Sequence, residues 1–127
     1  MTLYHSTLGQ APAVDFETAV LNGLAPDGGM YVPAEFPQVT HQQLEDWKEL
    51  SYPELAHKVL SLFIDETTVP SADLKTLINA SFSTFSHPEV IPHRPLTDDC
   101  YVQELFHGPA LSFKDVAMGF IVNLFDY

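Results

Sequence analysis

The chain has 127 residues, 46% of them hydrophobic, and its 17 acidic and five basic residues give a formal net charge of −12. This length is enough to bury one core, and the acidic charge argues against binding to nucleic-acid phosphates or to an anionic membrane surface. Cys100 is the single cysteine, and the sequence contains no secretory signal and no run of 18 apolar residues. We therefore expect a cytoplasmic domain without a metal site and with neither nucleic acid nor a membrane as its partner.

The first third of the sequence predicts a helix, a turn and a short strand. Asp15 is suited to the N-cap of a short helix, which Gly23 ends in a left-handed conformation. Residues 25–29, with the sequence APDGG, have the composition of a turn. The apolar residues 30–32 then predict a strand that stops at Pro33.

Capping signals predict three helices in the middle of the chain. Thr40 with Gln43 and Ser51 with Glu54 have the spacing of a capping box, and Ser71 is suited to cap a third helix. Apolar residues follow each signal at helical spacing. The residues expected to face inward are Leu44, Trp47, Leu55, Val59, Leu62, Phe63, Leu74, Leu77, Ile78 and Phe82.

A proline-rich stretch separates these helices from the end of the chain. Residues 86–97 contain three prolines and predict an irregular, extended crossing toward a strand at 101–105. Helices that alternate with a few short strands predict an α/β fold, with a small mixed sheet and several helices.

The last predicted helix is apolar on nearly all sides. Ser112 with Asp115 has N-cap spacing, so we expect this helix to begin at about Phe113. Apolar residues fill most of the positions from there to Tyr127. Because such a helix is typical of the interior of a larger body, the chain is expected to be the front piece of a longer protein. Alternatively, the helix docks against a second copy of itself.

Lys114 lies in this apolar surrounding and is the only Lys or Arg after Arg94. One explanation is that its stem packs on apolar surface while the ammonium reaches solvent. The other is chemical, because burial and the positive end of the helix dipole both favour the neutral amine. A neutral amine can form a Schiff base with an aldehyde such as pyridoxal phosphate, and Gly108 would let a ring approach the backbone.

Two stretches carry a resemblance to a known family. The run ELFHGPALSFKDVA at 104–117 resembles the cofactor-lysine motif of the threonine synthases, usually ELFHGPTLAFKDVA. The run AVLNGLAPDGGMYVP at 19–33 resembles the same family's N-terminal signature, AVLxGLAPDGGLYVP. The two motifs occur in the family's order, and the resemblance is expected to span all 127 residues.

The resemblance implies a fold, a cofactor and an activity. Threonine synthases are pyridoxal 5'-phosphate enzymes of fold type II, the tryptophan synthase β-like fold, and convert O-phosphohomoserine and water to threonine and phosphate. By resemblance, Lys114 is the catalytic residue that holds the cofactor covalently and shuttles protons. Phe113, Asp115 and His107 are implied as further residues of the cofactor site. Residues 1–97 would form the N-terminal domain, and residues 98–127 would begin the cofactor-binding catalytic domain.

The sequence departs from the family pattern in two positions and lacks one element. Ala110 replaces the usual threonine, which removes a hydroxyl, and Ser112 replaces a common alanine. No glycine-rich loop for the cofactor phosphate occurs in these residues. The chain alone is therefore expected to show no turnover and weak or no cofactor retention.

Two other functions remain open at this point. A threonine-synthase-like phospho-lyase would share these motifs but release a keto acid. A non-catalytic truncated module would instead self-associate through its exposed last helix.

Overall fold

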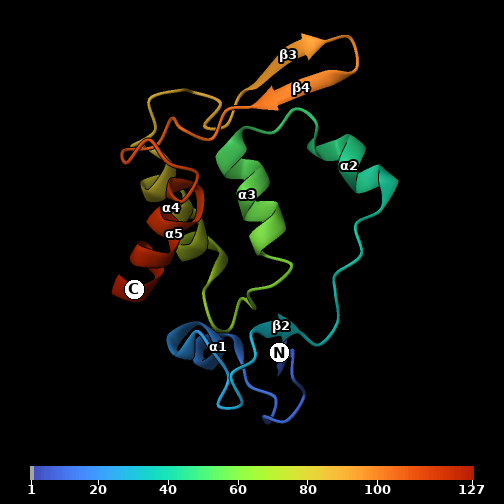
Figure 1. Ribbon diagram of the computed structural model, residues 1–127, viewed down its shortest axis with the longest axis vertical. Helices are drawn as coiled ribbons and strands as arrows, with labels where there is room; N and C mark the ends of the chain where they lie inside the picture. The colour runs from blue at the N-terminus through green and yellow to red at the C-terminus, as the bar shows by residue number, and fades with distance from the viewer. Residues whose placement is uncertain (1) are drawn as a thin grey trace. The chain divides into compact units, whose positions relative to one another are not determined.

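The computed structural model describes residues 2–127 and has an α/β architecture of five helices and two small antiparallel sheets in this range (Figure 1). Its residues group into two compact units. The first consists of Met1–Glu49 with His57–Leu74, and the second of Leu50–Ala56 with Lys75–Tyr127. No helix in residues 2–127 is long and apolar enough to cross a membrane.

The first unit begins with a two-stranded sheet and a short helix. Strand β1 (Tyr4–Ser6) pairs antiparallel with β2 (Tyr31–Pro33), one residue later than the expected strand. Helix α1 (Phe16–Asn22) lies between them in the sequence, and α2 (His41–Trp47) follows β2. The predicted caps of α1 are confirmed: the Asp15 carboxylate accepts the Thr18 N–H, and Gly23 ends the helix at φ 68°.

The residues 25–29, which we call the APDGG turn, form the predicted turn. The Asp27 carboxylate holds it, because Oδ1 accepts the Ser6 hydroxyl at 2.7 Å and the Gly29 N–H at 3.0 Å, while Oδ2 accepts the Gln10 N–H at 2.9 Å. These bonds, that from Ser6 first, lower the pKa of Asp27. A Cβ at Gly29 would lie 2.1 Å from the Ser6 hydroxyl oxygen, so the turn requires glycine at this position.

The capping signals of the middle helices are confirmed in two of three cases. Thr40 and Gln43 form the full capping box of α2, and Ser51 donates to the Glu54 carboxylate at the start of α3 (Tyr52–Leu60). Helix α4 (Ser71–Phe82) begins at Ser71 itself. Ser71 is therefore not its cap, because the preceding Pro70 carbonyl already accepts the N–H groups of Asp73 and Leu74.

Of the side chains expected to face inward, Leu74, Ile78 and Phe82 of α4 are buried, whereas Leu44 and Val59 are exposed. Leu74 is 1% exposed and belongs to the first unit, while Ile78 is 0% exposed and belongs to the second. In the second unit, the Phe82 ring packs edge-on against Tyr52 at 4.9 Å between ring centroids. The other buried apolar residues include Tyr4, Ala19, Ala25, Ile64 and Val69 in the first unit, and Val90 and Phe120 in the second.

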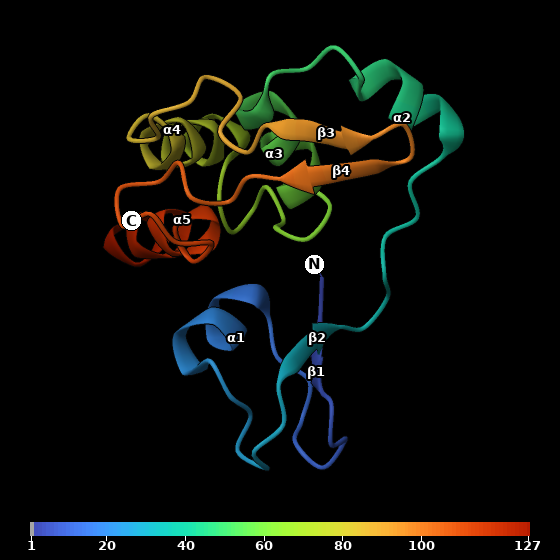
Figure 2. The ribbon, with the colours of Figure 1, turned by 45° about the horizontal axis from the view of Figure 1, so that its top comes forward.

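The proline-rich stretch forms a strand, and the expectation of an irregular crossing is wrong there. Strand β3 (His93–Thr97) pairs antiparallel with β4 (Cys100–Gln103), which is shorter than the expected strand at 101–105 (Figure 2). A strand can hold Pro95 because this sheet has only two strands, and the pairing shifts register between Pro95 and Thr97. The expected domain boundary after Thr97 falls in the turn of this hairpin and stays a prediction.

Candidate active site around Lys114

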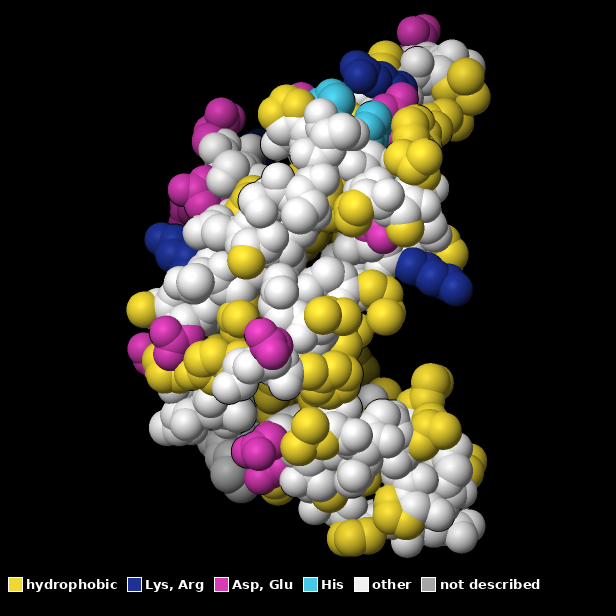
Figure 3. Space-filling model, turned by 90° about the vertical axis from the view of Figure 1, so that its left-hand side faces the viewer, with side chains coloured by type: hydrophobic (Ala, Val, Ile, Leu, Met, Phe, Trp, Pro, Cys, Tyr) yellow, Lys and Arg dark blue, Asp and Glu magenta, His cyan; other side chains and the backbone are white. Residues whose placement is uncertain are grey.

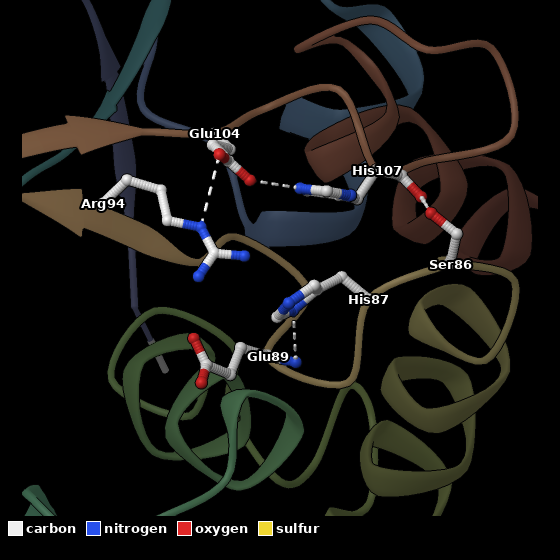
Figure 4. Close-up of polar contacts among 6 residues, drawn as sticks. All are labelled: Ser86, His87, Glu89, Arg94, Glu104 and His107. Carbon is white, nitrogen blue, oxygen red and sulfur yellow. Dashed lines mark hydrogen bonds and ion pairs between the residues drawn. The ribbon is translucent and has the colours of Figure 1, made fainter.

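The segment leading to Lys114 is attached to the rest of the second unit at its first residues. The Glu104 N–H, directly after β4, donates to the Pro92 carbonyl at 3.0 Å. Three residues later the His107 carbonyl accepts two hydrogen bonds from Ser86, from its N–H at 2.9 Å and from its hydroxyl at 3.1 Å (Figure 4). These hydrogen bonds therefore fix the main chain at the start of the 104–117 motif.

The Glu104 carboxylate joins His107 to the hairpin. Its Oε2 lies 2.7 Å from Nε2 of His107, and its Oε1 lies 3.4 Å from Nε of Arg94 (Figure 4). The Glu104 and His107 side chains are only 19% and 16% exposed, whereas Arg94 is 58% exposed. The hydrogen bond from His107, followed by the charge of Arg94, lowers the pKa of Glu104, although partial burial opposes the shift.

The His107 ring also packs against two other rings. Its centroid lies 4.6 Å from that of Phe106 and 5.0 Å from that of His87. His87 is itself held in its loop, because its Nδ1 accepts the Glu89 N–H at 3.2 Å. The imidazole of His107 is thus surrounded by side chains of its own unit.

Residues 108–115, which we call the lysine turn, are held by Asp115. Its Oδ2 accepts the Ala110 N–H at 2.9 Å and the Ser112 N–H at 3.4 Å. Gly108 is buried against the same side chain, since a Cβ there would lie 2.3 Å from the Asp115 Cβ. Leu111 adopts a positive φ of 55°, which is unfavourable for a residue with a side chain and marks a tightly constrained turn.

Lys114 stands at the junction of this turn with helix α5 (Asp115–Asp126), of which it is the N-cap residue. The expected helix start at Phe113 is therefore two residues too early. Ser112 and Asp115 form a turn instead of a helix cap: the Ser112 hydroxyl accepts the Lys114 N–H at 3.4 Å, and its carbonyl accepts the Asp115 N–H at 3.1 Å.

The Lys114 residue is exposed, which agrees with the explanation that its ammonium reaches solvent and not with the burial that would favour a neutral amine. Within residues 2–127 it takes part in no ion pair. Phe113 beside it is 66% exposed. The amine is thus accessible, at the positive end of a helix, to a ligand with an aldehyde and a negative charge.

Helix α5 is fastened to α4 by a small polar contact within the second unit. The buried Ser81 hydroxyl accepts the Asn123 side-chain N–H at 2.8 Å and donates to the Leu77 carbonyl at 2.7 Å. Gly119 lies over Ser81, and Phe120 is buried beside it. These contacts fix the helix whose first turn follows Lys114.

The structure thus brings the four expected site residues to two places. Lys114, Phe113 and Asp115 share the lysine turn. His107 instead belongs to the group formed by Arg94, Glu104 and His107, which we call the Glu104 cluster. Sequence reasoning missed Glu104 as a structural partner. Its three-residue spacing to His107 was an available signal.

The residues of this site fit the aldehyde of pyridoxal phosphate but provide no loop for its phosphate group. An exposed primary amine suits covalent attachment to an aldehyde. A glycine-rich loop to cradle the phosphate does not occur in the sequence. Among residues 2–127 no group of three or more His, Cys, Asp or Glu side chains could hold a metal ion.

Comparison with known proteins identifies the family of this chain. The family described as "Threonine synthase N terminus" matches residues 3–82, which is more than half of the chain. The chain belongs to the threonine synthase family. Threonine synthases from Schizosaccharomyces pombe and Saccharomyces cerevisiae are 47% and 44% identical to it over 98% of its length, and the human protein called threonine synthase-like 2 is 40% identical over the same share.

Solved structures support the same assignment and confirm the fold. The PLP-bound threonine synthase from Brucella melitensis matches all of this chain with a TM-score of 0.96 and 42% identity. The yeast threonine synthase matches 98% of the chain with a TM-score of 0.91 and 44% identity. The α/β fold is therefore that of the N-terminal part of threonine synthase structures.

The chain spans about a quarter of the length of these relatives. It covers 24% of the S. pombe protein, 26% of the S. cerevisiae and human proteins, and 27% of the Brucella structure.

Proposed function

We propose that this chain is the lysine-bearing N-terminal region of a threonine synthase that converts O-phosphohomoserine and water to threonine and phosphate in the cytoplasm. The match of the whole chain to a PLP-bound threonine synthase, at a TM-score of 0.96, carries the proposal. The exposed amine of Lys114 at the start of α5 supports it.

Lys114 is the proposed point of attachment for pyridoxal 5'-phosphate. When bound, the cofactor supplies an electron sink for carbanions formed on the amino-acid substrate. The amine of Lys114 also takes up and returns protons at the substrate carbons. Phe113, the residue before Lys114, presents an exposed ring, which suits contact with an aromatic cofactor.

Asp115 and His107 complete the proposed set of site residues. The Asp115 carboxylate holds the N–H groups of Ala110 and Ser112, so its contribution is to shape the lysine turn. His107 lies at the entrance to the same turn, next to Gly108 in the sequence. In this proposal, residues 1–97 are the N-terminal domain, and residues 98–127 begin the cofactor-binding catalytic domain.

The test uses the protein in which this chain is continued to the length of its relatives. With O-phosphohomoserine and pyridoxal phosphate, it should release phosphate and threonine in equal amounts. Lys114→Ala should lower turnover by about 10³-fold or more, because both attachment and proton transfer are lost. The 127-residue chain alone should show no turnover. Threonine formation by the Lys114→Ala protein at the wild-type rate would contradict the proposal.

A phospho-lyase activity is a second candidate. Proteins called threonine synthase-like 2, from human and Xenopus laevis, are each 40% identical to this chain over 98% of it, so the motifs do not separate the two groups. Product analysis does, because a phospho-lyase would release phosphate with a keto acid and no threonine.

Self-association is a third candidate and rests on the outer side of α5. Met118, Val122 and Phe125 are 49%, 58% and 54% exposed, which is unusual for apolar side chains on one helix. Hydrophobic side chains also reach the surface elsewhere, as one face of the molecule shows (Figure 3). Light scattering on the eluted 127-residue chain tests this candidate, since a monomer at high concentration would exclude it.

A further inference from the structure

Glu104 links two segments of the second unit through one side chain. Its two carboxylate oxygens contact Nε2 of His107 at 2.7 Å and Nε of Arg94 at 3.4 Å, so the segment after β4 is tied to β3 (Figure 4). The pair with His107 is mostly shielded from water, with side-chain exposures of 19% and 16%. A charged hydrogen bond in such a place is stronger than one on an open surface.

This contact decides which nitrogen of His107 carries a proton. A carboxylate oxygen can only accept, so Nε2 of His107 must be the donor. The ring is packed by Phe106 and His87, and the main-chain carbonyl is occupied by Ser86. These contacts hold His107 in place through its Nε2, its ring and its main-chain carbonyl.

His107 is also the last residue before the lysine turn. Gly108 follows it and is buried against Asp115, with no room for a side chain. The Leu111 N–H closes the turn by donating to the Gly108 carbonyl at 3.0 Å. A shift of His107 would therefore displace Gly108 and with it the contact that shapes the turn.

We propose that Glu104 is a positioning residue: through His107 it fixes the turn that presents Lys114. The inference deepens the proposed function, on which its importance for catalysis rests. It gives His107 a positioning role within the proposed site.

The experiment measures the free chain by NMR, with no cofactor present, in the wild type, Glu104→Ala and Glu104→Gln. In the wild type, the 15N signals of His107 should show a proton on Nε2. In Glu104→Ala that preference should be lost, and amide exchange of Ser86 and Leu111 should accelerate by roughly tenfold. Glu104→Gln should keep both properties near the wild type, because the Gln amide oxygen can accept the same hydrogen bond.

Glu89→Gln is the matched control, since Glu89 lies in the same group of residues and contacts His87 through its main-chain N–H (Figure 4). It should leave the His107 signals and the exchange of Ser86 and Leu111 unchanged. The Ser83 N–H, which donates to Asn79 within the same unit, reports general unfolding.

Two results would overturn the proposal. One is Glu104→Ala with wild-type exchange at Ser86 and Leu111. The other is Glu104→Gln with exchange as fast as in Glu104→Ala. If Glu104→Ala also accelerates the amide exchange of Ser83, that variant has unfolded. Exchange at Ser86 and Leu111 in Glu104→Gln then decides: exchange near the wild-type rate supports the proposal, and faster exchange overturns it. Because no cofactor or substrate enters these measurements, their failure is distinct from failure of the proposed function.

Discussion

The APDGG turn and the lysine turn are built in the same way but serve different ends. In each, one aspartate carboxylate accepts main-chain N–H groups of its surroundings, and one glycine lies where a Cβ would overlap another side chain. The APDGG turn places no basic or nucleophilic side chain at its surface. The lysine turn ends at the exposed amine of Lys114.

The difference lies in what each turn is attached to. Asp27 reaches outside its turn to Ser6, the last residue of β1, and to Gln10 in the loop that follows, and so joins three parts of the first unit. The Asp115 carboxylate instead accepts the N–H groups of Ala110 and Ser112, which both belong to its own turn. Placement of the lysine turn therefore depends on the Glu104 cluster before it and on α5 after it.

The largest expected effect comes from filling the two glycine positions. Gly29→Ala and Gly108→Ala should each lower the free energy of unfolding by about 1–3 kcal/mol, because the new Cβ would lie 2.1 Å from the Ser6 hydroxyl oxygen and 2.3 Å from the Asp115 Cβ. Urea unfolding followed by circular dichroism measures this loss.

Gly119→Ala is the control for this pair of substitutions. A Cβ at Gly119 would meet its nearest atom, the Ser81 carbonyl oxygen, at 3.6 Å, and the position lies inside α5. Alanine should therefore be neutral or stabilise by up to about 1 kcal/mol. A Gly108→Ala protein as stable as the Gly119→Ala protein would refute the close packing of the lysine turn.

A smaller loss of stability is expected when the hydrogen bond between α4 and α5 is removed. Ser81→Ala should cost about 1–2 kcal/mol, because the Asn123 side-chain amide loses its acceptor in a partly buried place. Ser83→Ala should change stability by less than about 0.5 kcal/mol, since the exposed Ser83 hydroxyl, just after α4, donates to the Ala80 carbonyl in the last turn of that helix. Equal losses for the two serines in urea unfolding would show that this contact does not hold α5.

The smallest effect is a difference in pH dependence. Hydrogen bonds lower the pKa of Asp27 in the folded chain, so the stability that its carboxylate contributes is present above its ordinary pKa of about 3.9. That contribution is lost as the pH falls through the lowered value, because the unfolded state binds the proton first. Asp27→Asn should flatten the decrease in stability below about pH 4, measured by thermal unfolding between pH 2.5 and 6. A curve as steep as that of the wild type would contradict the assigned network.

The APDGG turn could be predicted more fully than the lysine turn. Composition alone indicated a turn at 25–29, and Asp15 and Gly23 marked the helix before it, because these signals act over a few residues. The start of α5 was misplaced for a related reason. Asp115 reaches back to the N–H groups of Ala110 and Ser112, so a side chain expected to support a helix start supports the preceding turn.

Features that depend on distant residues could not be found in this way. Strand β3 exists because β4 pairs with it despite Pro95, and Glu104 matters because Arg94 and His107 converge on it. The apolar neighbours of Lys114 could not decide between a buried and an exposed amine, since several of them, such as Phe113 and Met118, are exposed as well.

The most direct test of the central claim is to locate the cofactor on the protein continued to the length of its relatives. The protein is incubated with pyridoxal phosphate, reduced with borohydride, digested and analysed by mass spectrometry. The pyridoxyl group should be found on the peptide containing Lys114, in near-stoichiometric amount, and should be absent from Lys48, Lys58 and Lys75. Labelling of those three lysines with Lys114 unmodified would contradict the account.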